Sequence, residues 1–274
     1  MEKISLPSKI EIQPGEDKNK ATVSIQPCHP GYGTTLGSAL RRVLLSSLPG
    51  AAVTAFKIKG VNHEFSAIPN VKEDVVEISL NLKQLRLKVH SEEPVRLELK
   101  VKGEKEVKGK DIKTTSDVEV VNPDLTIATL TSKDAEFDME LIVTQGRGYI
   151  PTEAREKEEL EVGMIAIDSI FTPVRNAGFQ IENVRVGQMT NYENLIMEIE
   201  TDGSITPRQA LELSTQILID HFNFIAEQVS DEKKSEPEEA EKEKKEETKE
   251  EKIEEEEEKK EEKPKKRGRP KKSA

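Results

Sequence analysis

Residues 29–50 read HPGYGTTLGSALRRVLLSSLPG, and this stretch predicts a helix with one apolar face. Either Thr34 or Thr35 can cap its start, and Pro49-Gly50 ends it. At about 100° per residue, the core face collects the side chains of Leu36, Ala39, Leu40, Val43, Leu44, Ser47 and Leu48. The helix therefore needs another element of the fold to cover that face.

The opposite face of this helix carries Ser38, Arg41, Arg42 and Leu45 together. A guanidinium group is always charged and offers planar, directional donors. Arginine beside an exposed large apolar side chain is typical of a protein interface, whereas a phosphate-binding face would have no use for Leu45. The alternative is two solvated arginines beside one stray leucine, and the periodicity leaves both interpretations open.

Most of residues 1–230 is predicted as strands, because short alternating runs recur between turn signals. These runs are Ala21–Gln26, Val53–Ile58, Val95–Val101, Asp117–Val121, Phe137–Val143 and Leu195–Ile199.

A second strong helix is predicted over Thr206–Val229, with Thr206 as its cap and Pro207 at its first position. Its apolar side chains lie on more than one side, so we expect it to pack on its own sheet and against a second copy of the chain. A weaker helix is predicted over Asp74–Leu85, with Val75, Ile78, Leu82 and Leu85 in register.

The two strong helices stand near opposite ends of residues 1–230, with a strand-rich block between them. This layout predicts an α+β fold in which one domain interrupts another. We expect a discontinuous dimerisation domain over 1–50 plus 171–230, made of an antiparallel sheet with two main helices. The inserted, mostly-β domain is expected over 51–170.

The last 44 residues differ sharply in composition, with 18 acidic and 16 basic residues, no aromatic side chain and Ile253 as the one large aliphatic. Such a segment cannot bury enough apolar surface to offset the entropy of ordering, so we predict a disordered, charged tail. Without it, the net charge of the body is −9. A broad phosphate-binding surface on the body is therefore not expected.

Cys28 is the only cysteine, which excludes an internal disulfide and fits a reducing compartment. Met1–Ile12 lacks the continuous apolar core of a signal peptide, and no apolar run approaches the length of a membrane span. We therefore expect a cytoplasmic protein without a membrane partner.

No catalytic constellation can be assembled from the sequence. The four histidines are scattered, and Cys28-His29 lacks a second ligand pair, so no metal site is predicted. Gly31, Gly33 and Gly37 do not have the spacing of a phosphate-binding loop, and we interpret them as residues that let a tight turn enter a packed helix. Gly146-Arg147-Gly148-Tyr149 is interpreted as a turn after a strand.

A colinear set of segments resembles the alpha subunit of bacterial DNA-directed RNA polymerase over about residues 1–230. The segments, in order, are Gly31–Ser47, Asn62–Phe65, Glu73-Asp74 with Leu80–Lys83, Gly146–Pro151, Asp168–Val174 and Glu198–Ile205. Such an ordered series is more specific than any single motif.

The resemblance implies a homodimeric platform on which the beta and beta prime subunits assemble. Nucleotidyl transfer and its magnesium would belong to those subunits, so we expect no catalytic residue and no cofactor in this chain. It implies contacts to the large subunits at Arg42, Leu45, Glu77 and Lys83, and Arg41 joins them from the helix face. Sigma factor would associate through the holoenzyme. For dimerisation, we expect contributions from Leu36, Leu40, Leu44, Leu218, Phe222 and Ile225.

The sequence departs from that family after residue 230. Most alpha subunits continue into a small helical domain that binds DNA and activators, and none is expected here. Residues 231–262 form an acidic linker, and residues 263–274 read KPKKRGRPKKSA, in which Arg267-Gly268-Arg269-Pro270 resembles an AT-hook. Glycine lets the backbone lie on the floor of the minor groove, and arginine suits narrow A·T runs. The alternative is a basic tail that has no specific partner or that folds back on its own acidic linker.

Two other classes of function fit the sequence less well than a polymerase subunit does. An independent architectural DNA-binding protein would use the basic tail, but the acidic body and the helix face with Arg41 and Arg42 argue against it. A stand-alone enzyme lacks a set of candidate residues. The sequence does not indicate which promoters or activators are served.

Overall fold

The computed structural model describes residues 4–155 and 161–230, and its antiparallel sheets and helices confirm the predicted α+β class. One compact unit covers Met1–Leu218. Residues 219–230 are the second half of the last helix and belong to a second unit.

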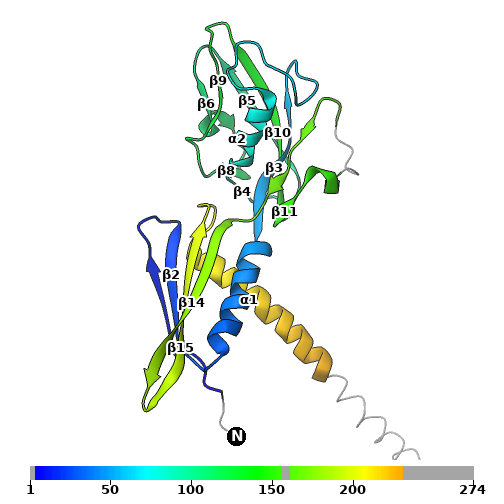
Figure 1. The fold of residues 1–274 in the computed structure, drawn as a ribbon. Coiled ribbons are helices and arrows are strands. Elements are labelled where there is room, and N and C mark those ends of the chain that lie inside the picture. Colours follow the sequence, from blue (N-terminus) through cyan, green and yellow to red (C-terminus); the bar gives the residue numbers. More distant parts are fainter. Residues whose placement is uncertain (1–3, 156–160, 231–274) are drawn as a thin grey trace, which may run out of the picture. The chain divides into compact units, whose positions relative to one another are not determined.

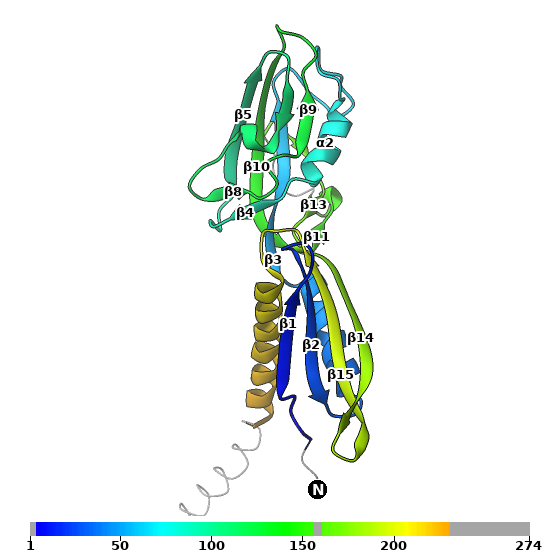
Figure 2. The same cartoon turned by 90° about the vertical axis from the view of Figure 1, so that its left-hand side faces the viewer.

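The first sheet has four antiparallel strands, which Figure 2 shows side by side. Their order is β1 (Lys9–Pro14), β2 (Lys20–Cys28), β15 (Met189–Thr201) and β14 (Val174–Val186). Alternate side chains of β2 and β15, among them Val23, Leu195 and Met197, are fully buried on one face. Helix α1 (Tyr32–Ser46) covers this face and packs on β14 and β15 (Figure 1).

Glycines allow α1 to approach the sheet closely. A Cβ atom on Gly37 would lie 2.7 Å from the Phe179 ring and 2.9 Å from a methyl group of Leu195. A Cβ on Gly33 would lie 2.7 Å from the Glu193 carboxylate. At the start of the helix, Gly31 adopts a φ of +85°. The interpretation of these glycines as residues that let a tight turn enter a packed helix is confirmed. The end of the helix is also as predicted, because α1 stops at Ser46 and Pro49 begins the next strand.

The second sheet has seven strands and lies between the two halves of the first in sequence. Its order is β7 (Ile112–Lys113), β5 (Val95–Lys102), β10 (Glu136–Arg147), β3 (Pro49–Ile58), β4 (Leu87–Val89) and β8 (Val118–Val120), with β12 (Ile165–Ala166) also paired to β3.

The described residues also contain two short ribbons and two 3₁₀ turns. Ribbon partners are β6 (Glu106–Lys108) with β9 (Thr126–Thr129), and β11 (Tyr149–Ile150) with β13 (Ser169–Ile170). The turns are η1 (Gly109–Asp111) and η2 (Thr152–Arg155). The predicted strand extends further than expected, because β10 continues to Arg147. The chain then bends at Gly148, whose φ is +67°, and β11 begins at Tyr149.

Helix α2 (Val75–Lys83) packs against β3 and β9. Its predicted stripe is confirmed, because Val75, Ile78, Leu82 and the following Leu85 are all buried. These side chains belong to a core built from residues 53–167, whereas a second core draws on residues 23–48 and 174–210. Each sheet thus has a core of its own. The domain boundaries at 51 and 171 stay predictions.

The last helix spans residues 207–230. Thr206 caps it as predicted, since Gln209 N–H donates to Thr206 Oγ1 at 3.3 Å and Thr206 N–H donates to Gln209 Oε1 at 3.0 Å. Ala210 and Ser214 are buried against the second core. In the part of the chain that the structure describes, no helix has the length and apolar character needed to cross a membrane.

Candidate protein-binding surfaces on α1 and α2

The start of α1 is fixed by a carboxylate from a distant strand. The backbone N–H groups of Gly31 and Gly33 each donate to the Glu193 carboxylate at 2.8 Å. A negative charge at a helix N-terminus is favourable, because it meets the free N–H groups and the helix dipole. The prediction that Thr34 or Thr35 caps this helix is wrong: Gly31 is the N-cap, in a left-handed conformation, and no side chain of its own caps the helix.

The outward face of α1 exposes the predicted guanidinium groups. Arg41, Arg42 and Ser38 are exposed, whereas Leu40 and Leu44 on the opposite side are buried. Leu45 differs from the prediction, because its side chain is partly buried against the core instead of standing free between the arginines. The face is therefore a pair of arginines on a helix that the core holds rigidly, with Leu45 at its edge.

On α2, the two predicted contact residues have different environments. Asp74 caps the helix by accepting from Glu77 N–H at 2.7 Å, and the Glu77 side chain is exposed. Lys83, in the last turn, is bound within the chain: its Nζ lies 2.9 Å from Asp168 Oδ2. Both side chains of this ion pair are 26% exposed. Lys83 thus offers a partner an ion pair, not an isolated ammonium group.

Asp168 is held by several donors. Besides Lys83, the Thr152 N–H donates to Asp168 Oδ1 at 3.0 Å. The Lys83 hydrogen bond first, and the Thr152 N–H next, hold the pKa of Asp168 at about 2, below its ordinary 3.8. Asp168 begins one of the segments that resemble the alpha family, but the sequence predicts no role for it. Only the folded chain brings it to Lys83, 85 residues away.

The β11–β13 ribbon lies between the ends of the two helices. On one side, Thr172 Oγ1 donates to the Leu45 carbonyl oxygen at 3.3 Å, and Phe171 N–H donates to Gly148 O at 2.8 Å. On the other side, Asp168 reaches Lys83. The structure therefore links the two predicted groups of contact residues through one short ribbon.

Within residues 4–155 and 161–230, no group of three or more His, Cys, Asp or Glu side chains has the geometry to hold a metal ion. The His29 ring contacts the rings of Tyr32 and Tyr192 edge to face, at 5.8 and 6.1 Å between centroids. Cys28 is buried, and this burial raises the pKa of its thiol. Neither residue is placed as a metal ligand.

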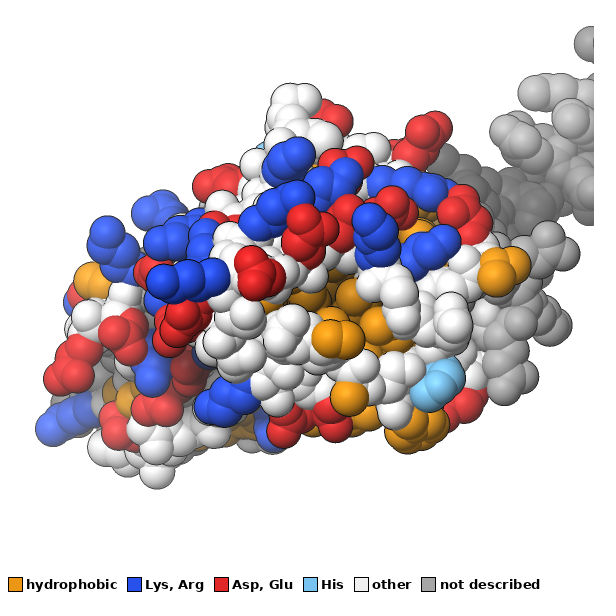
Figure 3. Space-filling view, turned by 90° about the horizontal axis from the view of Figure 1, so that it is seen from above, with side chains coloured by type: hydrophobic (Ala, Val, Ile, Leu, Met, Phe, Trp, Pro, Cys, Tyr) orange, Lys and Arg blue, Asp and Glu red, His pale blue; other side chains and the backbone are white. Residues whose placement is uncertain are grey.

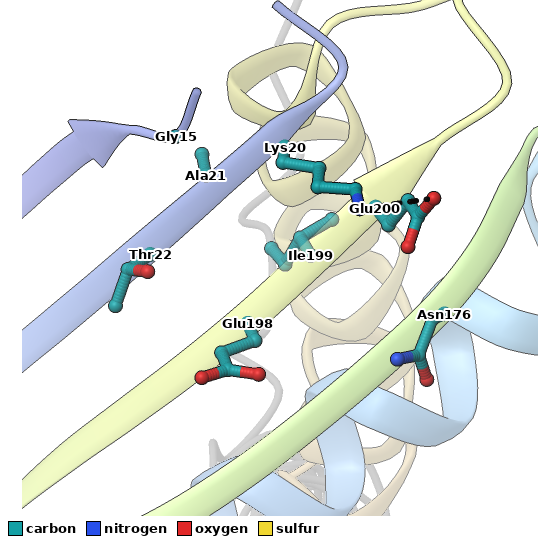
Figure 4. A pocket seen from close by; sticks show the side chains of 8 residues that line it. All are labelled: Gly15, Lys20, Ala21, Thr22, Asn176, Glu198, Ile199 and Glu200. Carbon is teal, nitrogen blue, oxygen red and sulfur yellow. Dashed lines mark ion pairs between the residues drawn. The ribbon is translucent and has the colours of Figure 1, made fainter. Parts of the chain in front are cut away.

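A cavity of about 250 Å³ lies on the four-stranded sheet, and Figure 4 shows the side chains that line it. Its polar lining comes from β2, β14 and β15, and includes Asn176, Glu198 and an ion pair in which Lys20 Nζ lies 3.7 Å from Glu200 Oε1. Lys20 and Glu200 are 50% and 33% exposed, so the pair is solvated and worth little. We assign no site to this cavity.

Known proteins resemble this chain over most of its length. The model of the RNA polymerase Rpb3/RpoA insert domain family matches residues 56–172. DNA-directed RNA polymerase subunit alpha of Macrococcus caseolyticus is 47% identical over 86% of this chain and 75% of its own length. The same subunit of Oceanobacillus iheyensis is 51% identical over 78% of this chain and 68% of its own. The chain belongs to the DNA-directed RNA polymerase subunit alpha family.

In this alpha-family chain, the six residues predicted for dimerisation fall into three groups by their exposure. Leu40 and Leu44 are buried in the core of a single copy, where they support the fold of α1. Their part in dimerisation stays a prediction. Leu36 and Leu218 are partly buried.

Phe222 and Ile225, in contrast, are 63% and 56% exposed. They share residues 219–230 with the exposed side chains of Ile219, Phe224 and Val229. An exposed cluster of apolar side chains of this size is unusual for a helix that contacts no other chain.

Charges of both signs are mixed on the surface. Figure 3 shows one face on which Lys and Arg side chains alternate with Asp and Glu. On strands β5 and β10, Lys102 Nζ lies 2.5 Å from Glu136 Oε1 and Lys100 Nζ lies 3.0 Å from Glu98 Oε2. Such a mixed surface is unlike a phosphate-binding patch. The acidic linker 231–262 and the tail with Arg267, Gly268, Arg269 and Pro270 lie outside the described residues.

Proposed function

We propose that this chain is the alpha subunit of a DNA-directed RNA polymerase, acting as a non-catalytic homodimer on which the beta and beta prime subunits assemble. Membership of the alpha family supports the subunit role. Nucleotidyl transfer and its magnesium would lie in the large subunits, and sigma factor would join through the assembled enzyme. No cofactor is assigned to this chain.

The observation that carries the docking proposal is the arginine face of α1. Arg41 and Arg42 are exposed on a helix whose other side is buried against β14 and β15. A rigid helix presents its side chains at low entropic cost, and arginine is enriched at the residues that dominate binding energy. Glu77 and the Lys83–Asp168 pair on α2 would form the second contact group.

Capture of the beta subunit tests this proposal. We expect the full chain to elute as a dimer that binds beta, and Arg42→Ala to leave the dimer intact while weakening beta binding by about 2 kcal/mol. Light scattering after size exclusion, with and without beta, measures both. Arg185→Ala removes an exposed arginine from the end of β14 and serves as the matched control. Equal capture of beta by the two variants would disprove the docking role of Arg42.

A second proposed contact is with DNA, through the basic tail. The observation in its favour is the sequence Arg267-Gly268-Arg269-Pro270 flanked by lysines. Arginines in a narrow A·T minor groove and lysines near phosphates give a salt-sensitive affinity. The proposed ligand is A·T-rich duplex upstream of a promoter.

Removal of residues 263–274 tests the DNA contact. We expect the assembled polymerase with this deletion to lose affinity for A·T-rich upstream DNA at low salt and to keep its core activity, as measured by mobility shift and by transcript synthesis. G·C-rich duplex is the control ligand. Unchanged binding to A·T-rich DNA would exclude the tail as a DNA contact.

A further inference from the structure

Two chain segments connect the four-stranded sheet to the seven-stranded sheet, and they touch each other backbone to backbone. The chain leaves α1 through Pro49–Ile58 and returns through residues 171–173 into β14. A Cβ atom on Gly50 would lie 1.8 Å from the Phe171 carbonyl oxygen, and one on Gly146 would lie 2.8 Å from the Phe171 ring. Phe171 itself is buried. This crossing is one fixed point between the two sheets.

A second contact between the two sheets is a charged one. Arg86 lies between α2 and β4, and Asp202 directly follows β15. Arg86 Nε is 4.0 Å from Asp202 Oδ2, and the two side chains are only 14% and 7% exposed. The pair therefore joins the body of the seven-stranded sheet to the end of a strand of the four-stranded sheet, in a place from which water is largely excluded.

Both partners are held in place by their neighbours. Asp202 Oδ1 accepts from Ser204 N–H at 2.9 Å and from Ser204 Oγ at 2.5 Å, and Asp202 N–H donates to Pro173 O at 2.9 Å. Arg86 N–H donates to Asn122 Oδ1 at 2.8 Å. The Asp202 carboxylate thus cannot leave Arg86 without breaking hydrogen bonds, and Asn122 anchors the backbone of Arg86.

The Arg86 guanidinium depends on Asp202. Its Nε is buried and has no hydrogen-bond partner among the residues that the structure describes. Burial lowers the pKa of Arg86, the Asp202 charge opposes this shift, and the charge of Arg175 adds to it. A buried cation is costly unless a counter-charge compensates it, so loss of Asp202 would drive Arg86 towards water.

We propose that the Arg86–Asp202 pair is a positioning contact that holds the two sheets in one orientation and so fixes the spacing between Arg42 on α1 and the Lys83–Asp168 pair on α2. The orienting role follows from the fold alone, and the role in docking rests on the proposed function. A large subunit that contacts both groups at once needs them at one fixed separation. If the two sheets could move relative to each other, binding would have to stop that motion, and this would add to the entropic cost of binding.

The distance between the sheets can be measured with spin labels on the full chain. Glu140→Cys on β10 and Glu182→Cys on β14 provide exposed strand positions, and the buried Cys28 is not labelled. A large excess of unlabelled chain suppresses distances between copies. The variants are Asp202→Asn, Arg86→Met and the two combined. Glu200→Gln, which removes the ion pair with Lys20 inside one sheet, is the matched control.

We expect Asp202→Asn to broaden the distance distribution most, because it leaves a buried cation unpaired. Arg86→Met removes the tether without that charge and should broaden the distribution less. The double variant should resemble Arg86→Met instead of the sum of the two, as expected for residues that act on each other. Glu200→Gln should leave the distribution unchanged. If Asp202→Asn does not fold, Arg86→Met and the double variant still give the comparison.

Capture of beta supplies the second measurement. We expect Asp202→Asn to bind beta about tenfold more weakly than the parent chain, which corresponds to about 1.4 kcal/mol. A distance distribution in all three variants equal to that of Glu200→Gln would overturn the orienting role. Broadening without any loss of beta capture would overturn the docking role. If the parent chain itself captures no beta, the proposed function fails, while the distance measurement still decides the role of the pair.

Discussion

At the scale of single residues, the Lys83–Asp168 ion pair makes stability depend on pH. The pKa of Asp168 is about 2 in the folded chain against an ordinary 3.8, so the unfolded chain binds the proton more readily. The contribution of this pair is therefore complete above about pH 4 and is lost as the pH falls towards 2. Because both groups are partly exposed to solvent, we expect about 1 kcal/mol at neutral pH.

Asp168→Asn tests this dependence. We expect the variant to unfold with a free energy lower by about 1 kcal/mol near pH 7, and the difference from the parent chain to shrink as the pH is lowered below about 4. Urea unfolding followed by circular dichroism at several pH values measures it. The control is Asp134→Asn, at an exposed loop position. A difference that stays constant with pH would show that the carboxyl charge is not what matters.

At the scale of elements, the packing of α1 on its sheet depends on a residue without a side chain. A methyl group at position 37 would overlap the Phe179 ring and Leu195, so Gly37→Ala must push α1 away from β14 or displace both side chains. We expect a loss of about 2 kcal/mol in the free energy of unfolding, in the range of other overpacked cores.

Gly178→Ala is the matched control for this substitution, because a Cβ atom at Gly178 in β14 meets nothing within 4 Å. Urea unfolding compares the two variants. If Gly37→Ala unfolds at the same urea concentration as Gly178→Ala, then α1 does not approach the sheet as closely as described. A stable Gly37→Ala chain that no longer binds beta would instead indicate that α1 had shifted with its arginines.

Helices proved more predictable from the sequence than strands. Both α1 and α2 have a clear 3.6-residue period. The predicted stripe of α2 is buried throughout, and on α1 Leu40 and Leu44 are buried as predicted. Strand β14 was missed, because a bulge near Val174–Asn176 interrupts its pairing with β15 and its exposed residues do not alternate regularly. The cap of α1 was predicted wrongly for a different reason. Its acceptor, Glu193, lies 162 residues from Gly31, so no local pattern could reveal it.

At the scale of the whole molecule, the candidate site could be predicted only in part. Periodicity placed Arg41 and Arg42 on an exposed face correctly, because that property belongs to one helix. It could not show that Leu45 packs partly into the core, or that Lys83 is paired with Asp168, since both depend on segments far away in sequence. Contacts between elements, such as Arg86 with Asp202, are likewise visible only in the folded chain.

The proposed self-association rests on the last helix. The exposed apolar side chains within residues 219–230 form a surface that water solvates poorly, and a second copy of the chain would bury it. We expect Phe222→Asp to convert the full chain from dimer to monomer, because a carboxylate placed in an apolar interface would lose its hydration. Light scattering over a range of concentrations measures the molar mass.

The matched control for this substitution is Phe65→Asp, which places the same charge at a loop phenylalanine that is 79% exposed. That variant should remain a dimer, since the loop lies outside the last helix. If Phe222→Asp and Phe65→Asp are both monomeric, then added negative charge, and not the helix surface, controls association of this acidic chain. If both variants are dimeric, then Phe222 lies outside the interface, and Ile225→Asp would decide whether the helix takes part at all.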